Sequence, residues 1–263
     1  MDLTIVGCTG SLPGPDSPAS CYLLTASEDG RRWQILLDLG AGSFGALHRH
    51  TDPDEIDAVV LSHLHPDHCL DVTAMRVWRG YGPTRPEGPL DIFGPPGSAD
   101  RLARAYAAEE PEPMQGMVFH DLVDGASFAV GPFTITPYAV LHPVPAFGLR
   151  VEAGGVVLAY TGDTDTCPGL VPLMRDADLV LAEAAFVEGR DEERGIHLTG
   201  RRAAEAAVAA GGVRRLMLTH LPPWNDPEVC RSEAEEVWGS GVEVAEPGRT
   251  YPLAEPAAED GRR

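Results

Sequence analysis

Four potential metal ligands stand within six residues of this chain, in the segment HLHPDH. His63 and His65 are separated by one residue, so in an extended segment both imidazoles point to the same side. Asp67 and His68 follow Pro66, which turns the chain, so they can face a second point nearby. Imidazole nitrogen and carboxylate oxygen suit Zn²⁺, although Mn²⁺, Co²⁺ or Fe could occupy the same ligand set. The segment therefore predicts a metal centre.

Three further side chains could complete a centre with two metals. Two cations about 3.5 to 4 Å apart need additional ligands, including one shared oxygen. Two imidazoles and one carboxylate able to bridge follow separate strand-like segments, at His142, Asp163 and His220. Three other histidines, His48, His50 and His120, are interpreted as surface residues. The predicted metal ligands are His63, His65, Asp67, His68, His142, Asp163 and His220.

Short apolar runs bounded by Gly, Pro and Asp predict the strands that carry these ligands. We expect strands at 2–6, 20–25, 33–38, 56–62, 90–93, 117–120, 126–129, 132–138, 176–184 and 213–220, and a hairpin within 147–163. We expect helices at 42–50, at 99–109 with Ser98 as N-cap, from Thr199 to about 210, and after Asp226-Pro227. Several polar clusters thus follow strand ends, which favours an α/β fold of sheets covered by helices.

Composition favours a soluble protein. The 263 residues suit one large α/β domain as well as two small ones, but no linker divides the chain; we therefore assign residues 1–251 to one domain and predict a disordered tail at 252–263. Five cysteines without a C-x-x-C spacing argue against a disulfide framework and a thiolate zinc site. The start lacks a signal peptide and no apolar run could span a membrane, so we predict a cytoplasmic protein without a membrane partner. The formal net charge of −20 disfavours nucleic acid as a partner.

The motif H-x-H-x-D-H resembles the signature of the metallo-β-lactamase superfamily, and the similarity extends from residue 2 to about residue 250. The resemblance implies a four-layer αββα sandwich with its site at the sheet edges. It also implies that His63, His65 and His142 hold the first metal, that Asp67, His68 and His220 hold the second, and that Asp163 bridges them. Members of the superfamily are often dimers, so a homodimer is one implied partner.

Further motifs resemble ribonuclease Z and its phosphodiesterase relatives. These are GCTGSLPGPDSPASCYLL at 7–24, DLGAG at 38–42, AEAAF at 182–186 and GIHLTG at 195–200. In that group a Glu and a His at the last two places form a dyad beside the metals, and here they are Glu183 and His197. The predicted catalytic residues are Asp67, Glu183 and His197.

The segment between His142 and Asp163 bears on the substrate. Ribonuclease Z typically carries its tRNA-binding arm there, whereas this interval is only 21 residues. The loops PDSPAS at 15–20, VWRGYGP at 77–83 and THLPPWNDPE at 219–228 resemble atypical class II cyclic-nucleotide phosphodiesterases of actinobacterial type. Pro66 departs from that class, in which Leu is typical. We therefore expect a small phosphodiester substrate, with a 3′,5′-cyclic nucleotide (cyclic AMP or cyclic GMP) favoured.

The resemblance implies hydrolysis by a hydroxide that bridges two divalent metals, with His197 as the general acid that protonates O3′. Three alternatives remain. The chain could be a ribonuclease Z-like RNA endonuclease, a lactonase or β-lactamase-like hydrolase acting on a carbonyl, or a metal-binding sensor with an inactive site.

Overall fold

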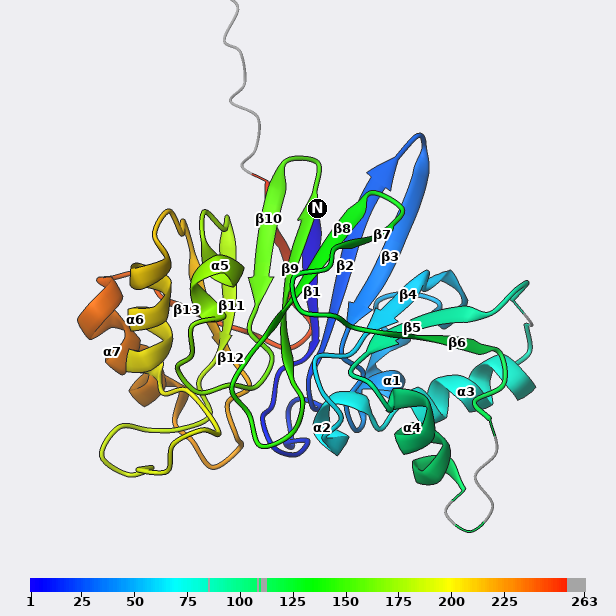
Figure 1. Cartoon of the computed structure of the whole chain (residues 1–263), viewed down its shortest axis with the longest axis horizontal. Helices are drawn as coiled ribbons and strands as arrows, with labels where there is room; N and C mark the ends of the chain where they lie inside the picture. Colours follow the sequence, from blue (N-terminus) through cyan, green and yellow to red (C-terminus); the bar gives the residue numbers. More distant parts are fainter. Residues whose placement is uncertain (85, 108, 110–112, 255–263) are drawn as a thin grey trace, which may run out of the picture.

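The computed structural model describes residues 1–84, 86–107, 109 and 113–254, which form two seven-stranded sheets with helices outside them (Figure 1). The first sheet has the order β14-β1-β2-β3-β4-β5-β6. Strands β1 to β3 and β14 pair antiparallel, and β3 to β6 pair parallel. Its strands are β1 (Asp2–Gly7), β2 (Cys21–Glu28), β3 (Arg31–Leu37), β4 (Ala58–Val60), β5 (Leu90–Gly94), β6 (Met117–Asp121) and β14 (Thr250–Pro252).

The second sheet repeats this mixture, in the order β13-β12-β11-β10-β9-β8-β7. Strands β7 to β10 pair antiparallel, and β10 to β13 pair parallel. Its strands are β7 (Phe128–Val130), β8 (Phe133–Ala139), β9 (Phe147–Ala153), β10 (Val156–Tyr160), β11 (Leu179–Glu183), β12 (Leu216–Thr219) and β13 (Glu243–Val244).

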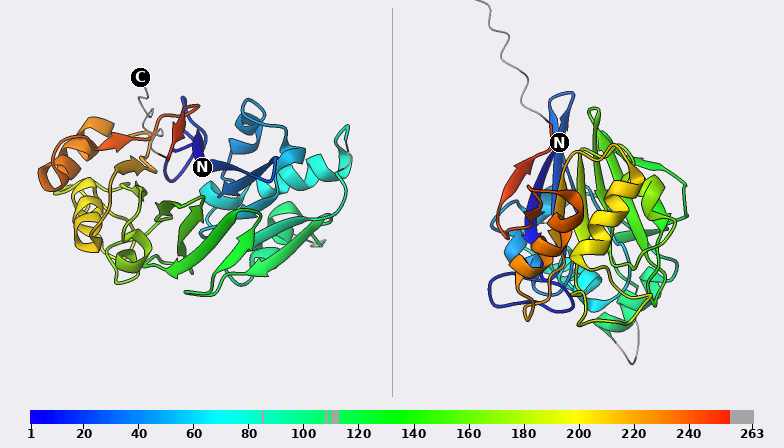
Figure 2. Two further views of the ribbon diagram at one scale, coloured as in Figure 1. Left: turned by 90° about the horizontal axis from the view of Figure 1, so that it is seen from above. Right: turned by 90° about the vertical axis from the view of Figure 1, so that its left-hand side faces the viewer.

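Helices cover the outer faces of both sheets. Figure 1 places α6 and α7 at one end and α1, α3 and α4 at the other, and the views in Figure 2 show the strands between them. The helices are α1 (Ser43–Leu47), α2 (Pro66–Cys69), α3 (Val72–Tyr81), α4 (Ser98–Tyr106), α5 (Leu170–Met174), α6 (Gly200–Ala210) and α7 (Pro227–Trp238), with a 3₁₀ helix at Pro53–Glu55.

The central strands are buried on both faces, which explains their continuous apolar sequences. In β3, Ile35 and Leu37 lie in the core between the two sheets, whereas Leu36 packs outward beneath the helices. In β11, Leu179 and Leu181 face the same inner core, and Val180 packs against the helices on the other side. Two outer cores therefore flank an inner core, and the chain has the expected αββα metallo-β-lactamase fold.

The helix boundaries confirm some predictions and correct others. Thr199 caps α6 by accepting a hydrogen bond from the Arg202 backbone N–H, and Asp226 caps α7 in the same manner. Ser98 is wrong as an N-cap, because Gly97 takes that position in the left-handed conformation and the Ser98 hydroxyl donates to the Pro95 carbonyl. Helices α3 and α5 and the short strand β13 were not predicted.

The last strand of the first sheet, β14, overlaps the start of the tail predicted at 252–263. Pro252 ends β14 and Leu253 is buried, so ordered packing continues past residue 251; residues 255–263 lie outside the described residues. All five cysteines are free, as expected. Within the described residues no helix is long and apolar enough to cross a membrane, and the longest, α7, has 12 residues.

Candidate metal centre

All seven predicted ligands lie at one edge of the two sheets. Strands β10, β11 and β12 are parallel, so their carboxyl ends meet at this edge. Asp163 follows β10 and His220 follows β12, while His63 follows β4 of the other sheet. Of the remaining ligands, His65 directly precedes α2, Asp67 and His68 lie within α2, and His142 lies in the loop after β8. The ligand atoms form two groups that share Asp163.

The first group contains three imidazoles. His65 Nδ1 lies 3.1 Å from His63 Nε2 and 3.1 Å from His142 Nε2. Asp163 Oδ2 lies 3.6 Å from His63 Nε2. His142 is oriented by its other ring nitrogen, Nδ1, which lies 2.9 Å from the Ile196 carbonyl. The proton of His142 is therefore held at Nδ1, and Nε2 keeps a lone pair toward the group.

The second group is more deeply buried. His68 Nε2 and His220 Nε2 are 3.2 Å apart, and Asp67 Oδ2 lies 3.1 Å from His220 Nε2. Asp67 and His68 belong to α2, which begins at Pro66 with His65 as its N-cap. The turn that Pro66 starts thus separates the first two ligands of the motif from the last two, as the sequence indicates.

Asp163 connects the two groups through its two oxygens. Oδ2 faces His63, whereas Oδ1 lies 3.1 Å from His68 Nε2 and 3.4 Å from His220 Nε2. Oδ1 is buried and has no hydrogen-bond partner. A buried carboxylate oxygen without a donor is costly, and a divalent cation would satisfy it. The residues present therefore fit a divalent metal site.

The first group is prepared electrostatically to bind a cation. Burial lowers the pKa of His63 well below its ordinary value, and neighbouring imidazoles lower it further. Burial likewise lowers the pKa of His65 and of His142. These imidazoles are consequently neutral at neutral pH, which is the protonation state that binds a metal.

The second group carries the negative charge. Burial opposes ionisation of Asp163, but the imidazoles of His220 and His68 hold the pKa of its carboxyl well below the ordinary value. Burial also opposes charge on His68, yet the carboxylates of Asp163 and Asp38 raise the pKa of this histidine well above its ordinary value. The carboxylates that stabilise a positive charge on His68 would equally stabilise a divalent cation bound among these residues.

Asp38 is a buried carboxylate that the motif analysis did not single out as a site residue. Its Oδ2 lies 2.7 Å from His68 Nδ1 and accepts from the Tyr160 hydroxyl at 2.7 Å and the Ser62 hydroxyl at 2.8 Å. Its Oδ1 accepts from the Ser62 backbone N–H at 2.7 Å. By accepting a hydrogen bond from Nδ1–H, Asp38 fixes the tautomer in which His68 Nε2 can act as a ligand. The position of Asp38 at the end of β3 was the signal that could have revealed it.

Two glycines allow the backbone to approach the ligands closely. A Cβ on Gly40 would lie 1.9 Å from the Asp67 carbonyl oxygen, and one on Gly10 would lie 2.2 Å from that of His220. His220 itself has a φ of +56°, in the left-handed region. The loop after β1 and the DLGAG segment therefore pack directly on the backbone of the second group.

His197 and Glu183 lie beside the ligands, where the dyad was expected. His197 Nδ1 is 2.9 Å from Glu183 Oε1 and 4.0 Å from Asp163 Oδ2. Glu183 is fully buried, and its carboxylate also accepts from the Thr164 and Ala185 backbone N–H groups. Burial lowers the pKa of His197, but the Glu183 carboxylate more than offsets this and raises it to about 9. The imidazole is therefore fixed in orientation and holds a proton.

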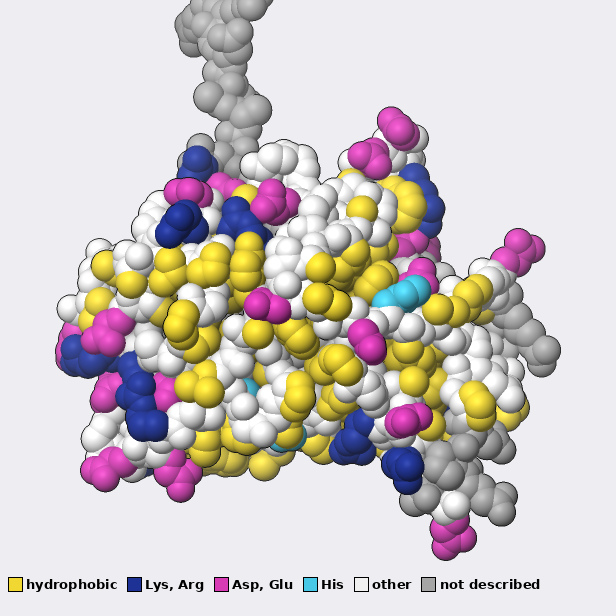
Figure 3. All heavy atoms as spheres, viewed as in Figure 1, with side chains coloured by type: hydrophobic (Ala, Val, Ile, Leu, Met, Phe, Trp, Pro, Cys, Tyr) yellow, Lys and Arg dark blue, Asp and Glu magenta, His cyan; other side chains and the backbone are white. Residues whose placement is uncertain are grey.

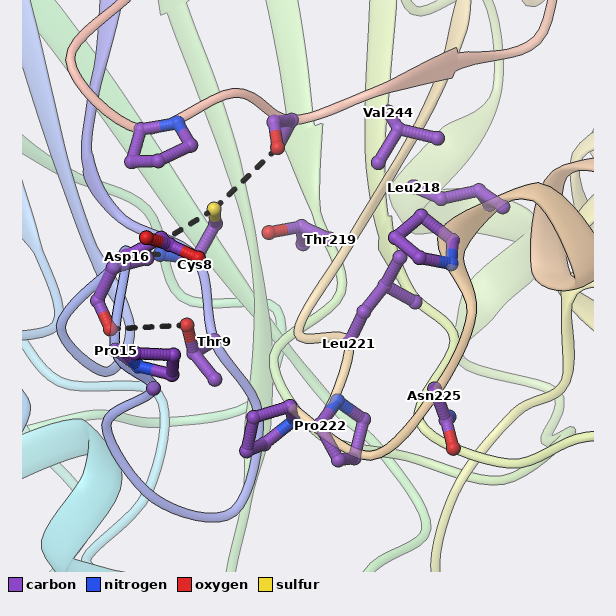
Figure 4. A pocket seen from close by; sticks show the side chains of 16 residues that line it. Cys8, Thr9, Pro15, Asp16, Leu218, Thr219, Leu221, Pro222, Asn225 and Val244 are labelled. Carbon is purple, nitrogen blue, oxygen red and sulfur yellow. Dashed lines mark hydrogen bonds between the residues drawn. The ribbon is translucent and has the colours of Figure 1, made fainter.

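Features outside the centre agree with a surface role for the other histidines. His48 and His120 are exposed, and His50 is half-buried. A separate pocket of about 290 Å³ is lined by Cys8, by Thr219 and Leu221 on either side of His220, and by other residues, but by none of the seven predicted ligands (Figure 4). On the face in Figure 3, basic side chains are scattered among acidic ones and form no continuous strip.

Comparison with known sequences places this centre in a family context. The sequence model of the beta-lactamase superfamily domain matches residues 33–221. The chain is 42% identical over 258 residues to an uncharacterised protein of Mycobacterium leprae (strain TN), covering 97% of this chain and 89% of that protein. It is 28% identical over 260 residues to the probable metallo-hydrolase YhfI of Bacillus subtilis (strain 168), covering 94% and 98%.

Solved structures share the same architecture. The crystal structure of the metallo-beta-lactamase fold protein YhfI from Bacillus subtilis superposes with a TM-score of 0.83 at 27% identity, covering 95% of this chain and 99% of that chain. Human tRNase Z in its short form superposes with a TM-score of 0.76 at 25% identity, covering 97% and 100%.

Proposed function

This chain belongs to the beta-lactamase superfamily of metallo-hydrolases, and on that premise we propose that it is a binuclear metal-dependent phosphodiesterase. The observation that carries the proposal is the placement of Asp163. Its two oxygens face two separate groups of ligands, and Oδ1 has no hydrogen-bond partner. His63, His65 and His142 would hold one cation, and Asp67, His68 and His220 the other. Zn²⁺ suits this donor set best.

Two such cations would supply an activated water and neutralise charge on the reacting phosphate. The protein itself supplies the proton for the leaving oxygen. The Nδ1–H of His197 donates a hydrogen bond to Glu183, and the protonated ring carries its second proton at Nε2. A ribose O3′ is a poor leaving group, so protonation by His197 lowers the barrier to its departure.

The surroundings of the site support a small substrate over a long RNA. The hairpin of β9 and β10 fills the interval between His142 and Asp163, where an RNA-binding arm would otherwise be inserted. The net charge of −20 repels a polyanion over most of the surface. We propose a 3′,5′-cyclic nucleotide, cyclic AMP or cyclic GMP, as the substrate.

A second candidate function is RNA cleavage of the ribonuclease Z type. The observation that favours it is the structural similarity to human tRNase Z, which covers the whole of that chain. Such an activity would require this acidic protein to hold RNA without an arm in the β9–β10 interval, so we rank it second.

The test replaces the proposed acid. His197→Ala should slow hydrolysis of cyclic AMP by about 10²- to 10⁴-fold, the range of general acid catalysis. Hydrolysis of bis(p-nitrophenyl) phosphate should slow much less, because p-nitrophenolate departs without a proton. Metal content should not change, and Glu183→Gln should show a weaker form of the same pattern. His120→Ala is the matched control, because this histidine is exposed and pairs with Asp91 away from the site.

Two results would contradict the proposal. Equal slowing on both substrates with metals retained would assign His197 to phosphate binding. Efficient 3′ processing of a tRNA precursor at physiological salt, without turnover of cyclic nucleotides, would favour the second candidate.

A further inference from the structure

We propose that the buried ion pair of Asp165 and Arg202 is a positioning device for His197; this inference rests on the proposed function of His197 as a proton donor. Asp165 is 1% exposed and Arg202 7% exposed. Arg202 Nη1 lies 2.8 Å from Asp165 Oδ1. Neither residue belongs to the two groups of predicted metal ligands, and both donate or accept hydrogen bonds in the loop that carries His197.

Asp165 connects, through hydrogen bonds, the loops that carry the site residues. It follows Asp163 by two residues, and its backbone N–H donates to the Leu141 carbonyl at 2.8 Å, beside His142. Its side-chain Oδ2 accepts from the Gly195 backbone N–H at 2.7 Å, two residues before His197. One residue therefore connects the loop after β8, the loop after β10 and the loop that precedes α6.

Asp165 is also saturated with donors, which fixes the direction of its carboxylate. Besides Gly195, Oδ2 accepts from Arg194 Nε at 2.8 Å. Oδ1 accepts from the Thr166 backbone N–H at 2.7 Å as well as from Arg202.

Arg202 acts on the backbone of His197 directly. It lies in the first turn of α6, and Nη1 donates to the His197 carbonyl at 3.1 Å as well as to Asp165. Its backbone N–H donates to the Thr199 hydroxyl, which caps the helix. The planar guanidinium thus ties a rigid helix end to the loop.

His197 is consequently held at two points. Glu183 fixes its imidazole, and Arg202 fixes its backbone. Residues 184–199 between β11 and α6 contain no helix or strand of their own, so these cross-links replace regular structure. A displacement of about 1 Å can cost about 10²-fold in rate, which makes such a backbone contact functionally important.

The experiment compares Arg202→Gln with Arg201→Gln, its neighbour on α6, which is more exposed and pairs with Glu236. In the protein as purified, Arg202→Gln should shift the ¹⁵N resonances of the His197 ring, assigned with His197→Ala, and Arg201→Gln should not. Arg202→Gln should slow hydrolysis of a phosphodiester with a poor leaving group about 10- to 100-fold. It should slow hydrolysis of bis(p-nitrophenyl) phosphate less than about 3-fold. If Arg202→Gln does not fold, Arg202→Lys replaces it in the same measurements, because lysine keeps the charge but lacks the planar guanidinium group.

Rates measured on aryl phosphodiesters of graded leaving-group pKa separate this inference from the proposed function. If the wild-type protein cleaves these esters but not cyclic AMP, the proposed substrate is wrong, and the graded series still tests the positioning role. The double variant Arg202→Gln/His197→Ala should be no slower than His197→Ala alone, because the ion pair acts through His197. Additive losses, equal slowing across the series, or unchanged His197 resonances would each overturn the inference.

Discussion

Replacement of Asp38 by Asn tests how the buried network prepares the second group of ligands. The carboxylate accepts four hydrogen bonds, three at Oδ2 and one at Oδ1. An amide satisfies most of these donors when its oxygen takes the Oδ2 position. Its NH₂ group then faces the backbone N–H of Ser62, so two buried donors oppose each other.

The magnitude follows from those two donors. Each buried donor left unsatisfied costs about 1–3 kcal/mol, so Asp38→Asn should destabilise the protein by about 2–6 kcal/mol. For a protein of this size this lowers Tm by roughly 4–24 °C. The variant should still fold, because total stability is usually about 5–15 kcal/mol. Loss of the charge next to His68 should also weaken metal binding by about 10- to 100-fold.

Thermal unfolding and metal analysis after dialysis against graded chelator measure the two effects. We expect metal content to fall toward one ion per chain, because Asp38 contacts only the second group, at His68. Tyr160→Phe is the control, since it removes one donor and keeps the carboxylate. It should cost only about 1 kcal/mol and retain both metals. Wild-type Tm and metal content in Asp38→Asn would refute the reasoning.

Three further outcomes are expected. Asp163→Ala should lose at least one metal and most activity, because no other carboxylate faces both groups among the described residues; full metal content with normal turnover would contradict this. Gly40→Ala should lower both Tm and metal affinity, since its Cβ would overlap the Asp67 carbonyl, whereas Gly45→Ala, where a Cβ meets nothing within 4 Å, should do neither. Chelation should lower Tm, by the equivalent of about 4 kcal/mol if the metal is present at about 1,000 times its Kd; an unchanged Tm on complete metal removal would show that the cluster is stable without cations.

The predicted ligand set illustrates what local sequence can reveal. HLHPDH places four ligands on one short segment, and apolar strands that end in a polar residue identify Asp163 and His220. The residues that these patterns single out lie close together because the carboxyl ends of parallel strands meet at one sheet edge. The split into two groups also follows from Pro66, which starts α2 between His65 and Asp67.

Other features depend on contacts that local patterns do not contain. Ser98 has the side chain of an N-cap, but Gly97 adopts the left-handed conformation that places the cap one residue earlier. Helix α3 was missed because, among Val72–Tyr81, only Val72, Met75 and Arg76 are buried, which leaves a weak apolar pattern. The role of Asp38 is not contained in its local sequence, because its partners His68 and Tyr160 lie 30 and 122 residues away.

The two parts of the site are held by different means. The proposed metal ligands Asp163 and His220 follow buried parallel strands, so the hydrophobic core itself fixes where they lie. His197 lies in a loop without regular structure, and polar contacts to Glu183 and Arg202 fix its position. Substitutions in the core should therefore change metal binding and stability together. Substitutions in the polar contacts should change proton transfer while the metals remain bound, so leaving-group dependence distinguishes the two classes.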